Sequence, residues 1–140
     1  MLAIRPWSSL VLAVYGFMLM AMGLYFIFLR PALLQVDLLY MKITLPDILK
    51  NDLGLQSWLK KVFWVMGSYI FTTGLLTFYI ARTSFRTREK SAFVIVVISG
   101  FSSIAFMAAV NFIIGSDFKW LLLVFTLPWA LALIFYRLNK

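Results

Sequence analysis

Four long apolar runs, each flanked by charged residues, constrain this chain more than any other feature of its sequence. The runs cover residues 7–29, 62–81, 92–115 and 120–136. A helix needs about 20 apolar residues to cross the roughly 30 Å hydrocarbon core of a bilayer, and about 17 suffice at the short end. With 64% hydrophobic residues, the chain also has too little polar surface for a water-soluble domain. We therefore expect one integral membrane domain over residues 1–140 with an all-α fold, a four-transmembrane-helix bundle.

The only long polar stretch, residues 31–61, lies between the first two runs and has a helical pattern. One face of the predicted helix carries apolar residues at spacings of four and three: Leu34, Leu38, Met41 and Leu45. Thr44 and Asp47 have the spacing of a capping box for a second short helix through Lys50, and Gly54 supplies its end. We expect one or two short interfacial helices over one end of the bundle, as a packed cover or as a gate.

The segment between the second and third runs has the highest density of positive charge. Its residues 82–90 include four basic ones: Arg82, Arg86, Arg88 and Lys90. Short loops rich in Lys and Arg stay in the cytoplasm, so the sequence predicts that this segment and both termini are cytoplasmic. The same four side chains either contact anionic lipid headgroups or serve only to set the topology.

The residues that most enzymes and metal sites use are missing from the runs. The chain has no Cys and no His, and its 13 basic and 5 acidic residues lie outside the runs or at their edges. Proton relays, cation channels and intramembrane acid–base enzymes require ionisable groups inside the membrane. We therefore expect a protein that is not an enzyme and has no catalytic residue, cofactor or metal. Its basic residues follow the membrane edges, which argues against nucleic acid as a partner.

Small and polar residues inside the runs offer two kinds of site. Small residues let membrane helices approach closely, and the predicted helix-packing face consists of Gly67, Gly74, Ser99, Ser103, Ala105 and Ala109. Asn111 is the strongest polar side chain in a run, and Trp129 follows Pro128 in the middle of the fourth. Asn111 either bonds a neighbouring helix or joins Trp64 and Trp129 as a candidate pocket for an apolar ligand.

Glycine recurs at the same spacing in the first two runs. Gly16 and Gly23 are seven residues apart, as are Gly67 and Gly74. The repeat is either a chance consequence of glycine being common in membrane helices or the trace of a duplicated two-span unit with inverted topology. The third and fourth runs do not continue it.

Two stretches, residues 23–31 and 58–77, resemble small uncharacterised bacterial four-span integral membrane proteins of about this length. The resemblance covers the first two runs. It implies a location in the bacterial inner (plasma) membrane and a four-helix fold, and it implies no activity.

Two functions are compatible with these features. Packing devices without ionisable groups favour an accessory or assembly subunit of a larger membrane complex. Its partners would be membrane lipids together with another membrane protein or, as a homo-oligomer, its own copies. The alternative is a carrier or binding protein for an apolar small molecule such as a lipid, quinone, isoprenoid or pigment. That pocket would be closed by residues 31–61 and edged by Trp64, Asn111 and Trp129.

Overall fold

The computed structural model describes residues 5–42, 44, 46 and 53–138, and all regular structure within them is helical. The first span is α1 (Arg5–Leu24), continued by the π-helical turn η1 (Tyr25–Leu29); the second is α4 (Leu53–Arg82). The third consists of α5 (Lys90–Gly100), the π-helical turn η2 (Phe101–Ala105) and α6 (Phe106–Ile113), and the fourth is α7 (Lys119–Leu138). These helices confirm the all-α four-helix bundle.

All four helices are long and apolar enough to cross a membrane. The second helix begins at Leu53, well before the predicted Val62, because good helix formers continue through its polar first turns. The third helix ends at Ile113 instead of Gly115. Gly115 adopts a positive φ of 67°, a backbone conformation that commonly ends a helix and that glycine takes without strain.

One short helix, α2 (Gln35–Met41), follows the first span as predicted. Its first turn is capped by the Asp37 carboxylate, which accepts a hydrogen bond from the Leu34 amide at 2.9 Å. Its end is marked by Lys42 in the left-handed conformation. The second predicted helix, from Thr44 through Lys50, falls mostly outside the described residues, and Gly54, which was predicted to end it, lies in the first turn of α4 instead.

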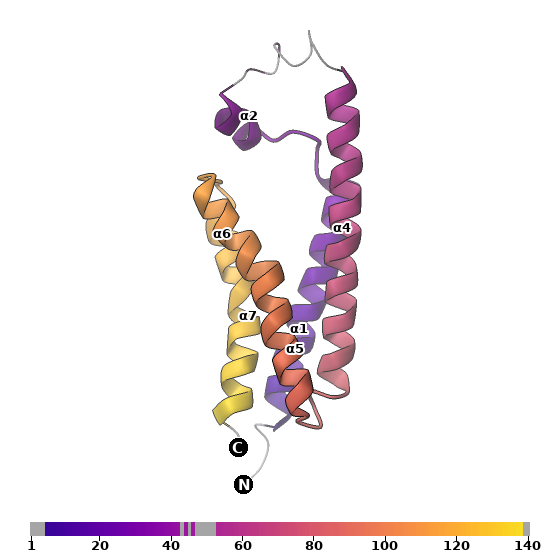
Figure 1. Cartoon of the computed structure of the whole chain (residues 1–140), viewed down its shortest axis with the longest axis vertical. Coiled ribbons are helices and arrows are strands. Elements are labelled where there is room, and N and C mark those ends of the chain that lie inside the picture. Colours follow the sequence, from indigo (N-terminus) through magenta and orange to yellow (C-terminus); the bar gives the residue numbers. More distant parts are fainter. Residues whose placement is uncertain (1–4, 43, 45, 47–52, 139–140) are drawn as a thin grey trace.

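The spans form two helix pairs arranged as a V (Figure 1). One pair is α1 with α4, and the other is the third span with α7. The pairs meet where α1 begins, α7 ends and α4 turns into α5, which we call the closed end. They diverge toward the opposite end, the open end, where α2 lies beyond the end of α6 and the segment that leads to it from the first span crosses the gap.

The α1–α4 pair is held by direct backbone contact at four glycines. A Cβ atom on Gly74 would lie 2.6 Å from the Gly16 carbonyl oxygen, and one on Gly67 would lie 2.7 Å from the Gly23 carbonyl oxygen. Because the two helices are antiparallel, equal spacings of seven let both contacts form at once. The glycine repeat therefore has a packing role, since only residues without a side chain fit at these crossings.

Aromatic rings and one arginine seal the closed end. Phe85 is 1% exposed, and its ring centre lies 4.6 Å from that of Tyr136. The Arg88 guanidinium lies 4.5 Å from the Tyr136 ring centre and donates a hydrogen bond to the Tyr136 carbonyl in the last turn of α7. A cation at this position also interacts favourably with the helix dipole. The Tyr136 hydroxyl in turn donates to the Glu89 carbonyl at 3.3 Å.

Candidate functional site

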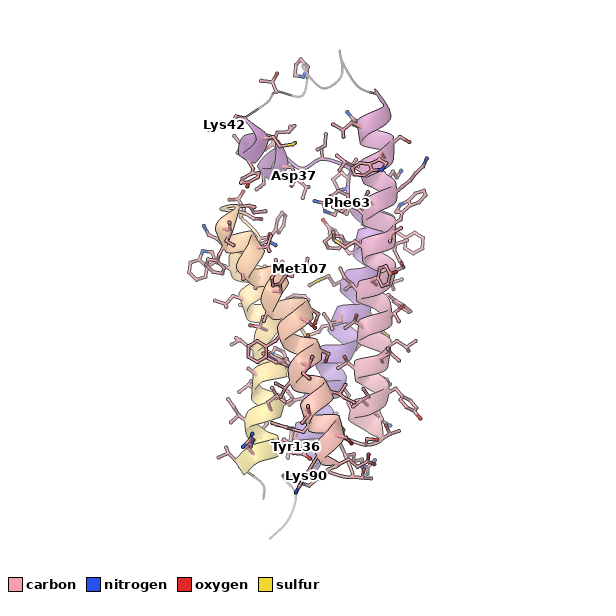
Figure 2. The ribbon with its side chains drawn as sticks, in the orientation of Figure 1. Asp37, Lys42, Phe63, Lys90, Met107 and Tyr136 are labelled. Carbon is pink, nitrogen blue, oxygen red and sulfur yellow. The ribbon has the colours of Figure 1, made fainter. Side chains whose placement is uncertain are left out.

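A cleft of about 840 Å³ lies between the diverging pairs at the open end. Its volume falls within the range of about 300–1,000 Å³ that is typical of small-molecule sites. Figure 2 shows Phe63 and Met107 on its two sides and Asp37 above it. All four spans and α2 contribute to the lining: Phe17, Met18, Ala21, Met22, Tyr25, Phe26, Arg30, Leu34, Val36, Asp37, Phe63, Met66, Met107, Val110, Asn111, Ile114, Ser116, Phe118, Leu121, Leu122 and Phe125.

The cleft is deep and has a polar and an apolar end. Its lining on the first span runs from Phe17 to Arg30, which at 1.5 Å per residue is about 20 Å, or about two-thirds of the hydrocarbon core. The end of the cleft away from Arg30 is lined by Phe17, Met18 and Phe125, and it is open to the surroundings, since Phe17 is 65% exposed. Charged side chains occur in the lining only at Arg30 and Asp37. The site is therefore shaped for a long apolar chain with a polar head.

The π-helical turn η1 sets the position of Arg30. The Arg30 amide donates to the carbonyl of Tyr25, five residues earlier, at 2.9 Å. Such a turn is wider than an α-helical one, so it changes the direction of the side chains that follow, and π turns are frequent at functional sites. Here the turn ends the first span with Arg30 at the polar end of the cleft, where its side chain is only 9% exposed.

Arg30 is held by one carboxylate, one carbonyl and two rings. Its Nη2 atom lies 3.3 Å from Asp37 Oδ2, and its Nη1 donates to the Pro31 carbonyl at 3.0 Å. Its guanidinium carbon lies 3.4 Å from the centre of the Phe63 ring and 5.5 Å from that of Phe26. Burial lowers the pKa of the Arg30 guanidinium from its usual value, and the charge and hydrogen bond of Asp37 oppose that effect.

Two uncharged polar side chains complete this end of the cleft. The Asn111 amide nitrogen donates to the Met107 carbonyl at 2.9 Å within its own helix. Ser116 is 3% exposed, and its hydroxyl accepts a hydrogen bond from the Phe118 amide at 3.2 Å. Among the described residues, no three acidic side chains come together to hold a metal ion. The polar end therefore offers hydrogen bonds and one ion pair to a ligand.

A smaller cavity of about 300 Å³ continues from the cleft between α2 and α4. Its lining consists of Ala32, Leu33, Val36, Asp37, Tyr40, Met41, Leu59, Phe63 and Ile114. Val36, Asp37, Phe63 and Ile114 line both spaces. The site thus extends past the Arg30–Asp37 ion pair into the space between α2 and α4.

The structure separates the three residues of the predicted pocket. Asn111 lines the cleft, whereas Trp64 is 46% exposed and does not line it. Trp129 is 7% exposed, and its indole N–H donates to the Val96 carbonyl at 2.9 Å. Its ring occupies the space above Gly100, where a Cβ atom would lie 2.1 Å away. Trp129 therefore joins the third and fourth spans, and Phe63 lines the cleft instead of its neighbour Trp64.

The predicted packing face is divided between buried and exposed positions. Gly67 and Gly74 are buried against α1. Of the four predicted residues on the third span, Ser99, Ser103 and Ala105 are half-buried and Ala109 is exposed. The buried stripe of that span is a row spaced by four: Ala92, Val96, Gly100, Ile104 and Ala108. Every second residue of this row is small, namely Ala92, Gly100 and Ala108, and this spacing was the sequence signal that could have identified the buried stripe.

The four basic residues of the segment 82–90 also differ from one another. Arg82, Arg86 and Lys90 are exposed, so they are placed where lipid headgroups could contact them. Arg88 instead packs on Tyr136, as described above. Sequence reasoning did not single out Arg30 and Asp37 as site residues, because each also fits an ordinary role, at a span end and as a helix cap.

No family model matches the chain, and comparisons with curated proteins and with solved structures returned no match. The function is therefore argued from the residues of the cleft.

Proposed function

We propose that this protein is a non-enzymatic membrane protein that binds, and can carry, a molecule with a long apolar chain. The cleft of about 840 Å³ at the open end is the observation that carries the proposal. Ligand sites are typically clefts of about 300–1,000 Å³ that are mostly apolar and carry a few polar groups. A space of this size, apolar along most of its depth and embedded among membrane spans, suits an apolar chain.

The chemistry of the lining favours binding over catalysis. Its only charged side chains, Arg30 and Asp37, are paired with each other. General acid–base catalysis needs a positioned group that gains or loses a proton near neutral pH. An arginine and a carboxylate engaged in helix capping are poor candidates for that role, so we propose no catalytic residue.

We also propose a location in the bacterial inner membrane with both termini in the cytoplasm. The density of Arg and Lys in residues 82–90 at the closed end supports this orientation. The open end of the cleft then faces the outer leaflet. A reporter enzyme that is active only in the cytoplasm, fused after Lys140, is expected to be active, and an inactive fusion would reverse the orientation.

The binding function is tested by native mass spectrometry of protein purified from membranes in mild detergent. We expect one defined apolar molecule to remain bound. Ala21→Trp places a large ring in the cleft and is expected to remove that molecule. Ala109→Trp is the matched control, because Ala109 is exposed on α6 and does not line the cleft. Equal retention by both variants, or no bound molecule in the parent, would refute the function.

An accessory or assembly subunit is the second candidate function. The exposed side of the third span carries the small residues Ser102 and Ala109, which are two helical turns apart. Such positions let another helix approach closely in lipid. In this case Ala109→Trp is expected to abolish a membrane complex or homo-oligomer detected by chemical cross-linking in native membranes. A monomer without cross-linked neighbours would exclude this function.

A further inference from the structure

We infer that the molecule held in the cleft is an amphiphile with an anionic head, a carboxylate or a phosphate, which binds to Arg30. The inference rests on the proposed binding function and names the chemical class of its ligand. Arg30, Asp37 and Phe63 at the polar end of the cleft carry the argument.

The hydrogen-bonding capacity of Arg30 is only partly used. A guanidinium has five N–H donors in a planar fork that matches a carboxylate or a phosphate. Among the described residues, Arg30 donates only to the Pro31 carbonyl and to one oxygen of Asp37. The contact to Asp37 is 3.3 Å long, whereas charge-assisted bonds of this kind are typically about 2.7–2.9 Å. Asp37 therefore pairs with Arg30 through one long contact.

Asp37 has a second role that explains this weak pairing. The same Oδ2 atom accepts the hydrogen bond from the Leu34 amide at 2.9 Å, which caps α2. The position of the carboxylate is thus set by the helix cap, and Arg30 shares an acceptor that is already engaged. An anion entering the cleft would offer Arg30 two oxygens in a fork geometry, which Asp37 does not provide.

Arg30 is also prepositioned and largely removed from water. Stacking on Phe63 at 3.4 Å fixes the plane of the guanidinium, and only 9% of the side chain is exposed. Electrostatic attraction is stronger in such an environment than in bulk water. A fixed, poorly solvated cation beside a large apolar cleft provides the contacts that an acidic head and its chain require.

The charge around the open end favours an anion. The described residues of this end include five basic side chains: Arg30, Lys42, Lys60, Lys61 and Lys119. They include two acidic ones, Asp37 and Asp117. Positive charge therefore exceeds negative charge among the described residues of this end, which attracts anionic ligands and disfavours cationic ones.

The test compares three probes with the same sixteen-carbon chain, namely hexadecanoate, hexadecyl phosphate and hexadecanol. Each is titrated into delipidated protein in a neutral detergent, and binding is read by native mass spectrometry. We expect the parent to bind one or both anionic probes at least about tenfold more tightly than hexadecanol, since hydrogen bonds to charged groups are worth about 1.5–3 kcal/mol. The ratio between the two anions distinguishes a carboxylate ligand from a phosphate ligand.

Arg30→Gln and Asp37→Asn are expected to change anion binding in opposite directions. Arg30→Gln should weaken the anionic probes about ten- to a hundredfold and leave hexadecanol unchanged. Asp37→Asn keeps an acceptor for the Leu34 amide but removes the competing charge, so it should strengthen the anionic probes roughly threefold or more. If Arg30→Gln fails to fold, Asp37→Asn decides alone: a gain in anion binding supports the inference, and no gain overturns it.

The two proposals fail in different ways. Equal affinities of the parent for all three probes, with Ala21→Trp removing all of them, would overturn the anionic head and keep the binding function. No binding of any probe by the parent would overturn both.

Discussion

The two ends of the bundle are built from the same kinds of helix and differ in whether side chains fill the space between the pairs. At the closed end each span buries one alanine: Ala13, Ala81, Ala92 and Ala132. At the open end each span contributes a long or aromatic side chain to the cleft, among them Met22, Met66, Met107 and Phe125. At the closed end these small residues bring the helix pairs together and the buried rings of Phe85 and Tyr136 fill the remaining space, whereas at the open end the side chains leave the cleft between the pairs. The filling of the space between the pairs thus distinguishes a sealed end from an end that can hold a ligand.

The glycine contacts between α1 and α4 are where we expect the largest effect on stability. Gly74→Leu would force a side chain against the backbone of α1 at Gly16 and should cost about 3 kcal/mol. Ser68→Leu is the control, because Ser68 is exposed on the same helix and its hydroxyl bonds only the Val65 carbonyl. Reversible unfolding in mixed detergent micelles measures both variants. Equal stability of the two would show that the α1–α4 contact is not close.

The contact between the third and fourth spans should have the next largest effect. Trp129→Phe removes the donor to the buried Val96 carbonyl and leaves a small void, at an expected cost of about 2 kcal/mol. Trp120→Phe, at an exposed position on the same helix, should change the free energy of unfolding by less than about 0.5 kcal/mol. A cost at Trp120 that matched the cost at Trp129 would contradict the packing described here.

The closed end should depend on Arg88 more than on its neighbours. Arg88→Gln loses the charge-assisted bond to the Tyr136 carbonyl and the contact with its ring, and we expect a loss of about 1.5 kcal/mol. Arg86→Gln removes the same charge at an exposed site and should be nearly neutral. Equal effects would mean that the charge of the loop matters and the seal on Tyr136 does not.

The smallest effect on stability is expected at the open end. Asp37→Asn weakens one long contact to a largely buried Arg30, while the amide oxygen can still accept from the guanidinium and from the Leu34 amide, so it should cost about 1 kcal/mol. The same variant is expected to strengthen anion binding, which separates ligand binding from stability at this residue. A loss of several kcal/mol would instead make the pair part of the structural core.

The spans could be predicted from the sequence because apolar length alone determines them. The runs at residues 7–29, 92–115 and 120–136 match helices to within two residues at each end. The glycine repeat could be seen in the sequence. Which glycines contact each other, however, depends on how the two antiparallel helices are aligned, and a sequence pattern does not give that alignment. Gly16 meets Gly74, and Gly23 meets Gly67, only because α1 and α4 are aligned in that way.

The cleft could be predicted only in part. Phe63 and Trp64 are adjacent aromatic residues, yet only Phe63 lines the cleft and Trp64 is 46% exposed. A rotation of about 100° per residue separates their directions, and nothing in the composition of the run sets which one faces inward. Asn111 could be identified because it is the only strong polar side chain in its span. Arg30 could not, because its position follows from the π-helical turn before it.

The central claim, a cleft that holds an apolar chain, is tested most directly through the methionine methyl groups. Met18, Met22 and Met107 line the cleft, whereas Met20, whose backbone nitrogen lies at Gly74 in the α1–α4 contact, does not line it. Protein with labelled methionine methyls is placed in deuterated lipid nanodiscs with protonated hexadecanoate, and NMR measures the magnetisation transfer between them. We predict transfer from the chain to Met18, Met22 and Met107 and none to Met20. Absence of transfer to all four methyls, with hexadecanoate present in excess, would contradict the account.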